Sequence, residues 1–436
     1  MRALTILPAL VGFFANSPLL AQGPLSPPPG VPAPNMKTLQ EIYDKICELE
    51  TKADLLEVGI IEQDNQIVQL GLINNLFVEA GLIQMVWSWE DLPVGSFDGV
   101  SIPAALAYTP SGQPAIAHYV TGPEVKYSVF DGSSWTTSHV ASLAGGGFSG
   151  NEVEISLAFT PQGHPAIAFH DPGDESLKYA AFNPSVGWQV STVRTAPFPG
   201  LPAGLFASMA FSPAGQPWIF YTRIDLSNHF LSYSEFNGTI WVHQDLETTS
   251  HPNYSGKFCA FKFNSDGRPV VAYEDSSSGQ SHLRIAEHNG TSWQFTTVDA
   301  TNGTGSAASL GFTPQRWPAI SYFNDSTNEL MYASFNGLTW SKTAVAPVAD
   351  DIEHTSLAFS AAGRPAIAYS MDSNNAPINY ATFDGTLWKV ELVADELFTT
   401  LGGNSALQFS PTGQPQLIFS NDAPLAFAKR GPFTNP

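Results

Sequence analysis

The chain has 436 residues, of which 18 are Lys or Arg and 39 are Asp or Glu, so its formal net charge at pH 7 is -21. Such an acidic surface repels phosphate backbones and anionic lipid headgroups, which argues against nucleic acid as a partner. The carboxylates suit solubility outside a cell, the favoured explanation, and more weakly suit calcium. With only Cys47 and Cys259, no disulfide framework holds the fold.

The first 21 residues have the composition of a secretory signal peptide. Arg2 is followed by an apolar stretch from Ala3 to Leu20, and small residues precede Gln22. The stretch is shorter than a bilayer span and is interrupted by proline, so a retained membrane anchor is the weaker alternative. No later segment is a membrane candidate. We therefore expect a mature chain without a membrane span, either secreted to the extracellular space or held at the cell surface.

Two segments lead to the main domain. Residues 22–35 are rich in proline, which predicts an extended linker. Residues 36–80 carry a heptad pattern in which nine of the ten core positions are apolar, and this predicts a helical coiled coil that joins the protein to itself as a dimer or trimer. A single amphipathic helix docked on the domain is the alternative. The core positions are Leu39, Ile42, Ile46, Leu49, Ala53, Leu56, Ile60, Gln63, Ile67 and Leu70.

Residues 85–436 contain seven copies of one unit. Each copy has a proline at the start of its second strand, and successive prolines are 51, 52, 52, 49, 47 and 50 residues apart. A strand-rich repeat of this length is typical of a β-propeller, in which each copy forms one four-stranded antiparallel blade. We therefore predict an all-β, seven-bladed propeller. The prolines are Pro114, Pro165, Pro217, Pro269, Pro318, Pro365 and Pro415.

Each copy shows the same signals in the same order. A short apolar strand such as 357–359 ends in an aromatic residue, and a glycine two residues before the proline supplies the positive φ of a tight hairpin. The fifth copy has Arg316 at this glycine position. The second strand is an apolar run such as 366–369, which fits a strand covered on both faces. The third strand leads to Asn-Gly or Asp-Gly and then to a tryptophan, except in the second copy, where residues 183–188 predict a distorted turn.

The seventh copy indicates how the ring closes. It reaches its third strand near Phe427 and ends within ten residues, without the strand that begins at tryptophan. Residues 85–92, just before the first copy, resemble the fourth strand at 388–392. We predict that this N-terminal strand completes the last blade and removes its exposed edge.

The hairpin before each tryptophan resembles the second half of the Asp-box of sialidase-type propellers, Ser-x-Asp-x-Gly-x-Thr-Trp, which also joins the third and fourth strands of a blade. The chain is equally similar to bacterial and fungal propeller lectins, which carry repeated aromatic residues around a ring. The resemblance covers 85–436 and implies the fold and the repeat style, with a degenerate box. The box glycine and tryptophan are matched by Gly238 and Trp241, Gly290 and Trp293, and Gly337 and Trp340; its Asp is replaced by Phe236, His288 and Phe335.

Two sets of repeated residues are candidates for ligand binding. Fourth-strand tryptophans present aromatic faces that suit the apolar side of a sugar ring, although packing of the outer strands is the favoured explanation. Loops between the second and third strands carry acids that suit sugar hydroxyls or calcium, although turn formation is favoured there. The first set is Trp135, Trp241, Trp293, Trp340 and Trp388, with Trp188 in the second copy. The second set is Asp171, Asp174, Glu175, Asp275, Asp325, Asp372 and Asp422.

Signals for catalysis are weak. The compact clusters of acids and histidines are His170 with Asp171 and Asp174, and residues 350–354. Paired carboxylates of this kind serve glycoside hydrolysis. The chain has no zinc-binding spacing, P-loop, nucleophile elbow or dinucleotide fingerprint. We therefore assign no catalytic residue, no metal ligand and no cofactor, with calcium left open, and predict a protein that is not an enzyme.

The favoured function is a secreted, non-catalytic binding or scaffold protein. Its coiled coil joins several propellers, and the loop face recognises an extracellular glycan or protein with added avidity. One alternative is a structural surface or matrix component without a small ligand. The other alternative is a glycoside hydrolase or lyase.

Overall fold

The computed structural model describes residues 85–92, 103–120, 124–143, 154–197, 200–225, 228–249, 255–276, 279–371, 377–394, 405–420 and 425–432. The predicted signal peptide (1–21), linker (22–35) and coiled coil (36–80) lie outside these residues. In the part that is described, no helix is long and apolar enough to cross a membrane.

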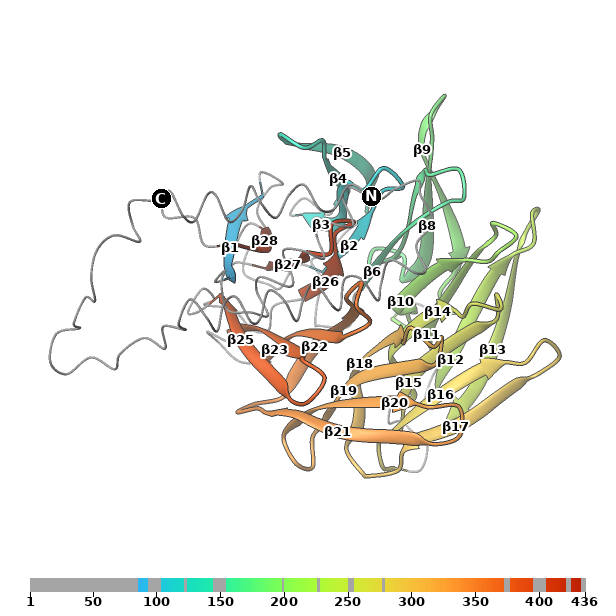
Figure 1. Cartoon of the computed structure of the whole chain (residues 1–436). Coiled ribbons are helices and arrows are strands. Elements are labelled where there is room, and N and C mark those ends of the chain that lie inside the picture. Colours follow the sequence, from blue (N-terminus) through green and yellow to red (C-terminus); the bar gives the residue numbers. More distant parts are fainter. Residues whose placement is uncertain are drawn as a thin grey trace, which may run out of the picture. The chain divides into compact units, whose positions relative to one another are not determined.

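Seven four-stranded antiparallel sheets are arranged as the blades of a propeller, which confirms the predicted fold (Figure 1). Within the first six blades the strands follow one another from the innermost to the outermost in chain order. In every blade, the second strand begins at one of the predicted prolines.

The strands of the first three blades are as follows. Blade 1 contains β2 (Ala104–Tyr108), β3 (Pro114–Val120), β4 (Glu124–Phe130) and β5 (Trp135–Ser142). Blade 2 contains β6 (Ile155–Phe159), β7 (Pro165–Asp171), β8 (Ser176–Asn183) and β9 (Gly187–Arg194). Blade 3 contains β10 (Ala203–Phe211), β11 (Pro217–Asp225), β12 (Asn228–Phe236) and β13 (Trp241–Thr249).

The next three blades repeat this order. Blade 4 contains β14 (Ser255–Phe263), β15 (Pro269–Asp275), β16 (His282–His288) and β17 (Trp293–Asp299). Blade 5 contains β18 (Thr304–Phe312), β19 (Pro318–Asn324), β20 (Glu329–Phe335) and β21 (Trp340–Pro347). Blade 6 contains β22 (Ile352–Phe359), β23 (Pro365–Met371), β24 (Ile378–Phe383) and β25 (Trp388–Ala394).

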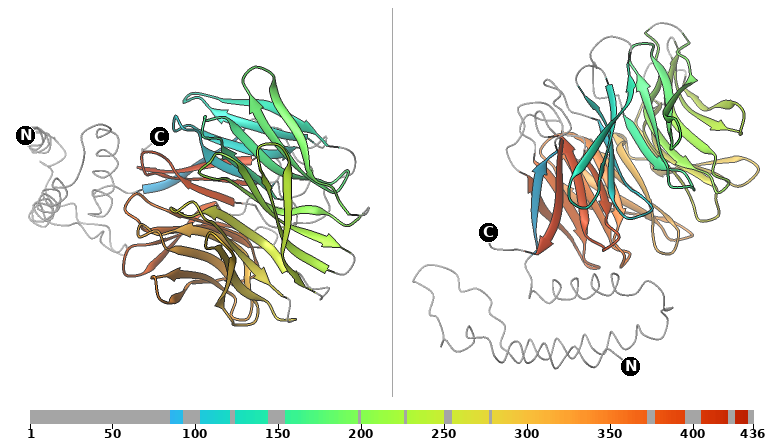
Figure 2. Two further views of the ribbon diagram at one scale, coloured as in Figure 1. Left: turned by 90° about the vertical axis from the view of Figure 1, so that its right-hand side faces the viewer. Right: turned by 90° about the horizontal axis from the view of Figure 1, so that it is seen from above.

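The seventh blade joins strands from the two ends of the described chain. From the inside outward it contains β26 (Ser405–Phe409), β27 (Pro415–Ser420), β28 (Leu425–Pro432) and β1 (Met85–Asp91). β1 pairs antiparallel with β28 along its whole length, and Leu92 N–H donates to the Leu425 carbonyl over 2.7 Å. Both views of Figure 2 show β1, in blue, beside β28, in red. The predicted closure by the N-terminal strand is therefore confirmed.

The blades pack against one another through their two inner strands. The innermost strands alternate buried and partly exposed residues, as in β6, so that one set of side chains packs between blades and the other faces the axis of the ring. The second strands are buried along almost their whole length, as in β3, because a neighbouring blade covers each face. Small residues such as Ala117 and Ala168, both fully buried, allow this close approach.

The turns between first and second strands interlock from blade to blade. The glycine of each turn has a φ of the left-handed region, such as 74° at Gly363. A Cβ on Gly363 would also lie only 2.1 Å from Cγ of Pro314, in the turn of the preceding blade. Pro411 of the last blade faces Gly112 of the first blade in the same way. The glycine thus serves both the turn and the contact between blades.

The exception at Arg316 follows from the same contact. Arg316 adopts a φ of 69°, and its N–H donates to the Thr313 carbonyl at 2.8 Å, so the turn keeps its shape without glycine. The preceding blade has Ser265 where most others have proline. Without a proline ring to meet, the position accepts a side chain, although the backbone conformation still costs about 1 kcal/mol.

The hairpins before the tryptophans have the predicted form. In blade 1, Phe130 pairs with Trp135 across a four-residue turn. In blade 2, Asn183 pairs instead with Gly187 across a three-residue turn. The predicted distortion of the second copy is therefore confirmed.

Removing β1 should weaken the whole ring. A chain that starts at residue 93 exposes the edge of β28 and loses the contact of Trp87 with Tyr380 of blade 6, whose ring centroids lie 5.1 Å apart. We expect the melting temperature, measured by calorimetry, to fall by on the order of 10 °C relative to a chain that starts at residue 84. Equal melting temperatures would show that closure contributes little.

A matched pair of glycine substitutions tests the interlocked turns. Gly363 and Gly413 have φ values of 74° and 80°, but a Cβ on Gly413 would meet nothing within 4 Å. Both alanine variants therefore lose about 1 kcal/mol through backbone strain. Gly363→Ala should lose about 1–3 kcal/mol more in the free energy of unfolding, measured by denaturant titration, because it overpacks Pro314. Replacing Pro314 by Ala in the same chain should recover most of that additional loss; equal effects of the two glycine variants would contradict the proposed contact.

Candidate functional site

The described acidic residues of the predicted set lie on one face of the ring, formed by the loops between second and third strands and by the crossovers between blades. We call it the crossover face. In blade 2, Lys178 Nζ lies 2.5 Å from Asp174 Oδ2 and 3.9 Å from Asp171 Oδ2. Glu175 Oε2 lies 3.2 Å from Nε2 of the buried His170. These acids are therefore partnered within their own blade.

The remaining predicted acids belong to other blades. Asp275 Oδ2 lies 3.0 Å from Nη1 of Arg284. Asp325 is exposed in the turn between β19 and β20, and its N–H donates to the Gly303 carbonyl at 2.8 Å. Asp372 and Asp422 lie outside the described residues. The structure thus distributes the acids among blades, and among the residues it describes no group of three or more His, Cys, Asp or Glu is placed to hold a metal ion.

The predicted tryptophans lie at the opposite end of the blades, beside the third-to-fourth hairpins. The structure therefore does not bring them together with the acids. Each lies against the third strand of the preceding blade, and in most blades it meets a tyrosine ring there. Ring centroids are 5.1–5.7 Å apart for Trp87 with Tyr380, Trp135 with Phe427, Trp188 with Tyr127, Trp241 with Tyr179, Trp293 with Tyr233, and Trp388 with Tyr332, while Trp340 packs beside the cluster that contains Ile285.

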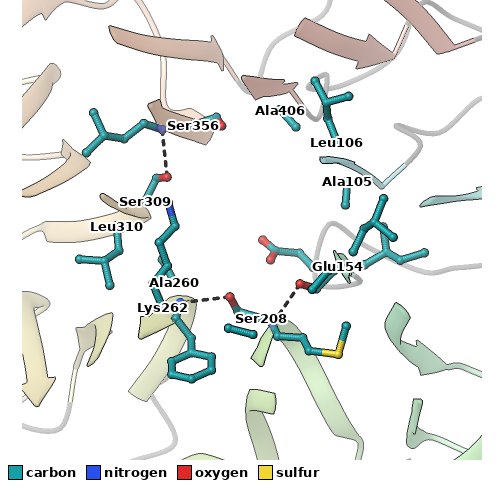
Figure 3. A pocket seen from close by; sticks show the side chains of 18 of the residues that line it. Ala105, Leu106, Glu154, Ser208, Ala260, Lys262, Ser309, Leu310, Ser356 and Ala406 are labelled. Carbon is teal, nitrogen blue, oxygen red and sulfur yellow. Dashed lines mark hydrogen bonds between the residues drawn. The ribbon is translucent and has the colours of Figure 1, made fainter. Parts of the chain in front are cut away.

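The innermost strands enclose a cavity of about 540 Å³ on the axis of the ring (Figure 3). All seven blades contribute to its wall. Every blade places a small residue three positions before the aromatic that ends its innermost strand, and these residues keep the axis open. They are Ala105, Ser156, Ser208, Ala260, Ser309, Ser356 and Ala406.

The four serines among these seven small residues also connect neighbouring blades. Ser156 Oγ accepts the N–H of Met209 at 3.0 Å. The same bond recurs from Phe261 to Ser208 at 3.0 Å, from Leu357 to Ser309 at 3.0 Å and from Leu407 to Ser356 at 2.9 Å. Because a hydroxyl also carries one donor, the serines combine a structural bond with an O–H group near the cavity.

Two titratable residues meet at the end of the cavity nearer the crossover face, which we call its mouth. Glu154 directly precedes β6 and His354 lies in β22, and Glu154 Oε1 is 3.8 Å from His354 Nδ1. Burial raises the pKa of Glu154 to about 7 and lowers the pKa of His354 to about 4. Between pH 4 and 7 both groups are therefore mainly uncharged and act as hydrogen-bonding groups.

A cation lies toward the other end of the cavity. Lys262 is one residue before the end of β14, close to the turn between first and second strands. Its side chain lines the cavity, across from Glu154 in Figure 3. Burial lowers the pKa of Lys262.

Sequence reasoning found only part of this site. It grouped His354 with residues 350–353, whereas the structure places His354 beside Glu154, from a blade on another part of the ring. Neither Glu154 nor Lys262 was a predicted site residue. A usable signal exists: Glu154 and His354 both stand five residues before the aromatic that ends an innermost strand, at a position that faces the axis.

The pKa of Glu154 predicts a pH-dependent effect of Glu154→Gln. A carboxyl whose pKa is raised on folding stabilises the fold fully only below its unfolded value near 4.5, and this contribution is lost as pH rises through about 7. The variant should therefore be more stable than the parent at pH 8, by on the order of 1 kcal/mol, and should lose this advantage at pH 4. His354 titrates in the opposite sense, so comparison of the two chains at each pH isolates Glu154. Thermal unfolding that shows no such pH dependence would contradict the assigned pKa.

No family model matches the chain, and no curated protein matches it. Solved structures with the same architecture include a polysaccharide lyase of family PL25, an ulvan lyase, with a TM-score of 0.55, 11% identity, and coverage of 78% of this chain and 95% of that chain. They also include the BP39L lectin from Burkholderia pseudomallei, with a TM-score of 0.55, 14% identity, and coverage of 78% of this chain and 100% of the lectin. At these identities the likeness establishes a shared propeller fold.

Proposed function

We propose that the propeller is a non-catalytic carbohydrate-binding domain that takes up its ligand at the mouth of the cavity on the crossover face. The observation that carries the proposal is the pair of Glu154 and His354 at this mouth, 3.8 Å apart. Near pH 6 a protonated carboxyl and a neutral imidazole offer both donors and acceptors without charge. Sugar hydroxyls, which donate and accept in turn, match such groups.

The cavity below the pair supports the same proposal. Its volume of about 540 Å³ falls in the range of small-molecule sites. Alanine and serine side chains leave room for a sugar ring and add hydroxyl groups close to it. The lectin and the polysaccharide lyase with the same fold are both carbohydrate-directed by name, which favours a glycan over other small ligands.

The segments that precede the propeller also bear on the proposal. The signal peptide and coiled coil that the sequence predicts support a protein outside the cell, and an oligomer would present several cavities at once. Linked weak sites gain avidity without new contacts. In the structural alternative, the protein is a surface or matrix component without a small ligand, and the crossover face contacts another protein.

A second candidate function is catalysis at the same mouth, by a glycoside hydrolase or a lyase. A carboxyl whose pKa is about 7 exchanges its proton at neutral pH, as general acid or base catalysis requires. His354 Nδ1 lies 3.8 Å from Glu154 Oε1, so a small movement of either side chain would let them share this proton. We rank this function second because Glu154 is the one carboxyl among the described lining residues, whereas glycoside hydrolysis uses a pair.

Substitution of His354 tests the proposed function. A glycan array, read with and without calcium, first identifies a bound sugar. Affinity for that sugar, measured by calorimetry at pH 6, should fall at least tenfold in His354→Ala, because the mouth loses a hydrogen-bonding group worth about 1.4 kcal/mol or more. His139→Ala is the matched control, since His139 is an exposed residue of β5 on the outer side of its blade.

Three other outcomes would count against the proposal. Equal affinity of both histidine variants would move the site away from the cavity. An array without any signal would favour the structural component. Release of reducing ends or unsaturated products from the bound glycan, abolished in Glu154→Gln, would establish the second candidate function.

A further inference from the structure

Lys262 departs from the repeat at a position where the other blades have uncharged residues. It stands one residue before the aromatic that ends the innermost strand. A long cation is not needed to build a blade at this position, because six blades form without it. The counterparts of Lys262 are Ala107, Ala158, Ala210, Gly311, Ala358 and Gln408.

Lys262 also lacks a carboxylate partner among the described residues. Its ammonium has no ion pair there, even with Glu154 across the cavity. Lys262 is the one Lys or Arg among the described residues that line the cavity. Several partly or fully buried cations are paired, as shown by Lys178 with Asp174 at 2.5 Å, Arg223 with Asp245 at 2.9 Å, Arg284 with Asp275 at 3.0 Å, and Arg430 with Glu391 at 2.6 Å.

The surroundings of Lys262 favour the binding of an anionic ligand beside its ammonium group. The side chain is exposed to the cavity, so a ligand can reach it, yet protein surrounds it closely enough for burial to lower its pKa. An anion beside the ammonium would offset the lost hydration. In such a setting a charge-assisted hydrogen bond is stronger than one between neutral groups.

We propose that Lys262 binds an acidic group, a carboxylate or a sulfate, on the sugar that enters the cavity. This inference rests on the proposed function, because it names the class of carbohydrate that the same cavity selects. Glu154 and His354 lie four strand positions away from the level of Lys262, roughly 13 Å at 3.3 Å per residue, before side-chain reach is counted. A short saccharide therefore contacts both ends, with its acidic unit toward Lys262.

The charge of the protein limits how acidic this ligand is. A net charge of -21 repels a polyanion at long range, and one lysine neutralises one group. The cavity therefore selects a short saccharide that carries a single acidic unit, rather than a densely charged polysaccharide.

Calorimetry at pH 6 tests the inference with three disaccharides that differ only in one terminal unit: glucose, glucuronic acid or glucose 6-sulfate. The parent protein should bind at least one acidic form tenfold or more tightly than the neutral form, and the better of the two identifies the acidic group. Lys262→Met, which keeps most of the length of the side chain and removes its charge, should reduce acidic binding to the neutral level. Lys429→Met removes the same charge from an exposed position on β28 and should change neither affinity.

Lys262→Ala provides a second variant that imitates the other blades and should keep the parent melting temperature. Retention of the acidic preference in Lys262→Met, or equal affinity of the parent for all three sugars, would overturn the inference while leaving the proposed function intact. Failure of all three sugars to bind the parent would overturn the inference and, together with a glycan array without any signal, the proposed function as well. Loss of neutral and acidic binding together in Lys262→Met, with an unchanged melting temperature, would assign Lys262 to general binding and reject its role in charge selection.

Discussion

The hydrogen bonds between β1 and β28 join two strands from opposite ends of the described chain, and the rest of the propeller depends on them. A blade has apolar residues on both faces, so it is stable only when a neighbour covers each face. Seven blades meet this condition when the last contacts the first, as the contact of Pro411 with Gly112 shows. Pairing of β1 completes the last blade, and the cavity on the axis is a consequence of the closed ring.

Repetition and its exceptions have different roles in this molecule. Residues that recur in most blades build contacts: proline against glycine in the turns, serine against the next strand, and tryptophan against tyrosine between outer strands. Glu154, Lys262 and His354 do not recur, yet all three line the cavity. Local departures from a consistent pattern mark functional sites in many proteins. Here these departures lie together on the axis, which is why we place the site there.

Charge is organised differently on the crossover face and in the cavity. Predicted acids of blades 2 and 4 are paired with cations of their own blades, which stabilises loops and limits their availability to a ligand. In the cavity, burial shifts the pKa of Glu154 and His354 toward their neutral forms. Lys262 faces the same space without an ion-pair partner among the described residues. A mainly acidic protein thereby presents a polar, locally cationic interior.

The sequence by itself determined the number of blades, their strand order, the turn positions and the closing strand, because each of these follows from a period and from residues adjacent in the chain. It even indicated the exceptions at Arg316 and at 183–188. It did not determine which unlike residues meet. Glu154 and His354 are two hundred positions apart, and Lys262 lies between them in another blade. Only the closed ring, which turns one position of every inner strand toward a common axis, decided that these three residues share one cavity.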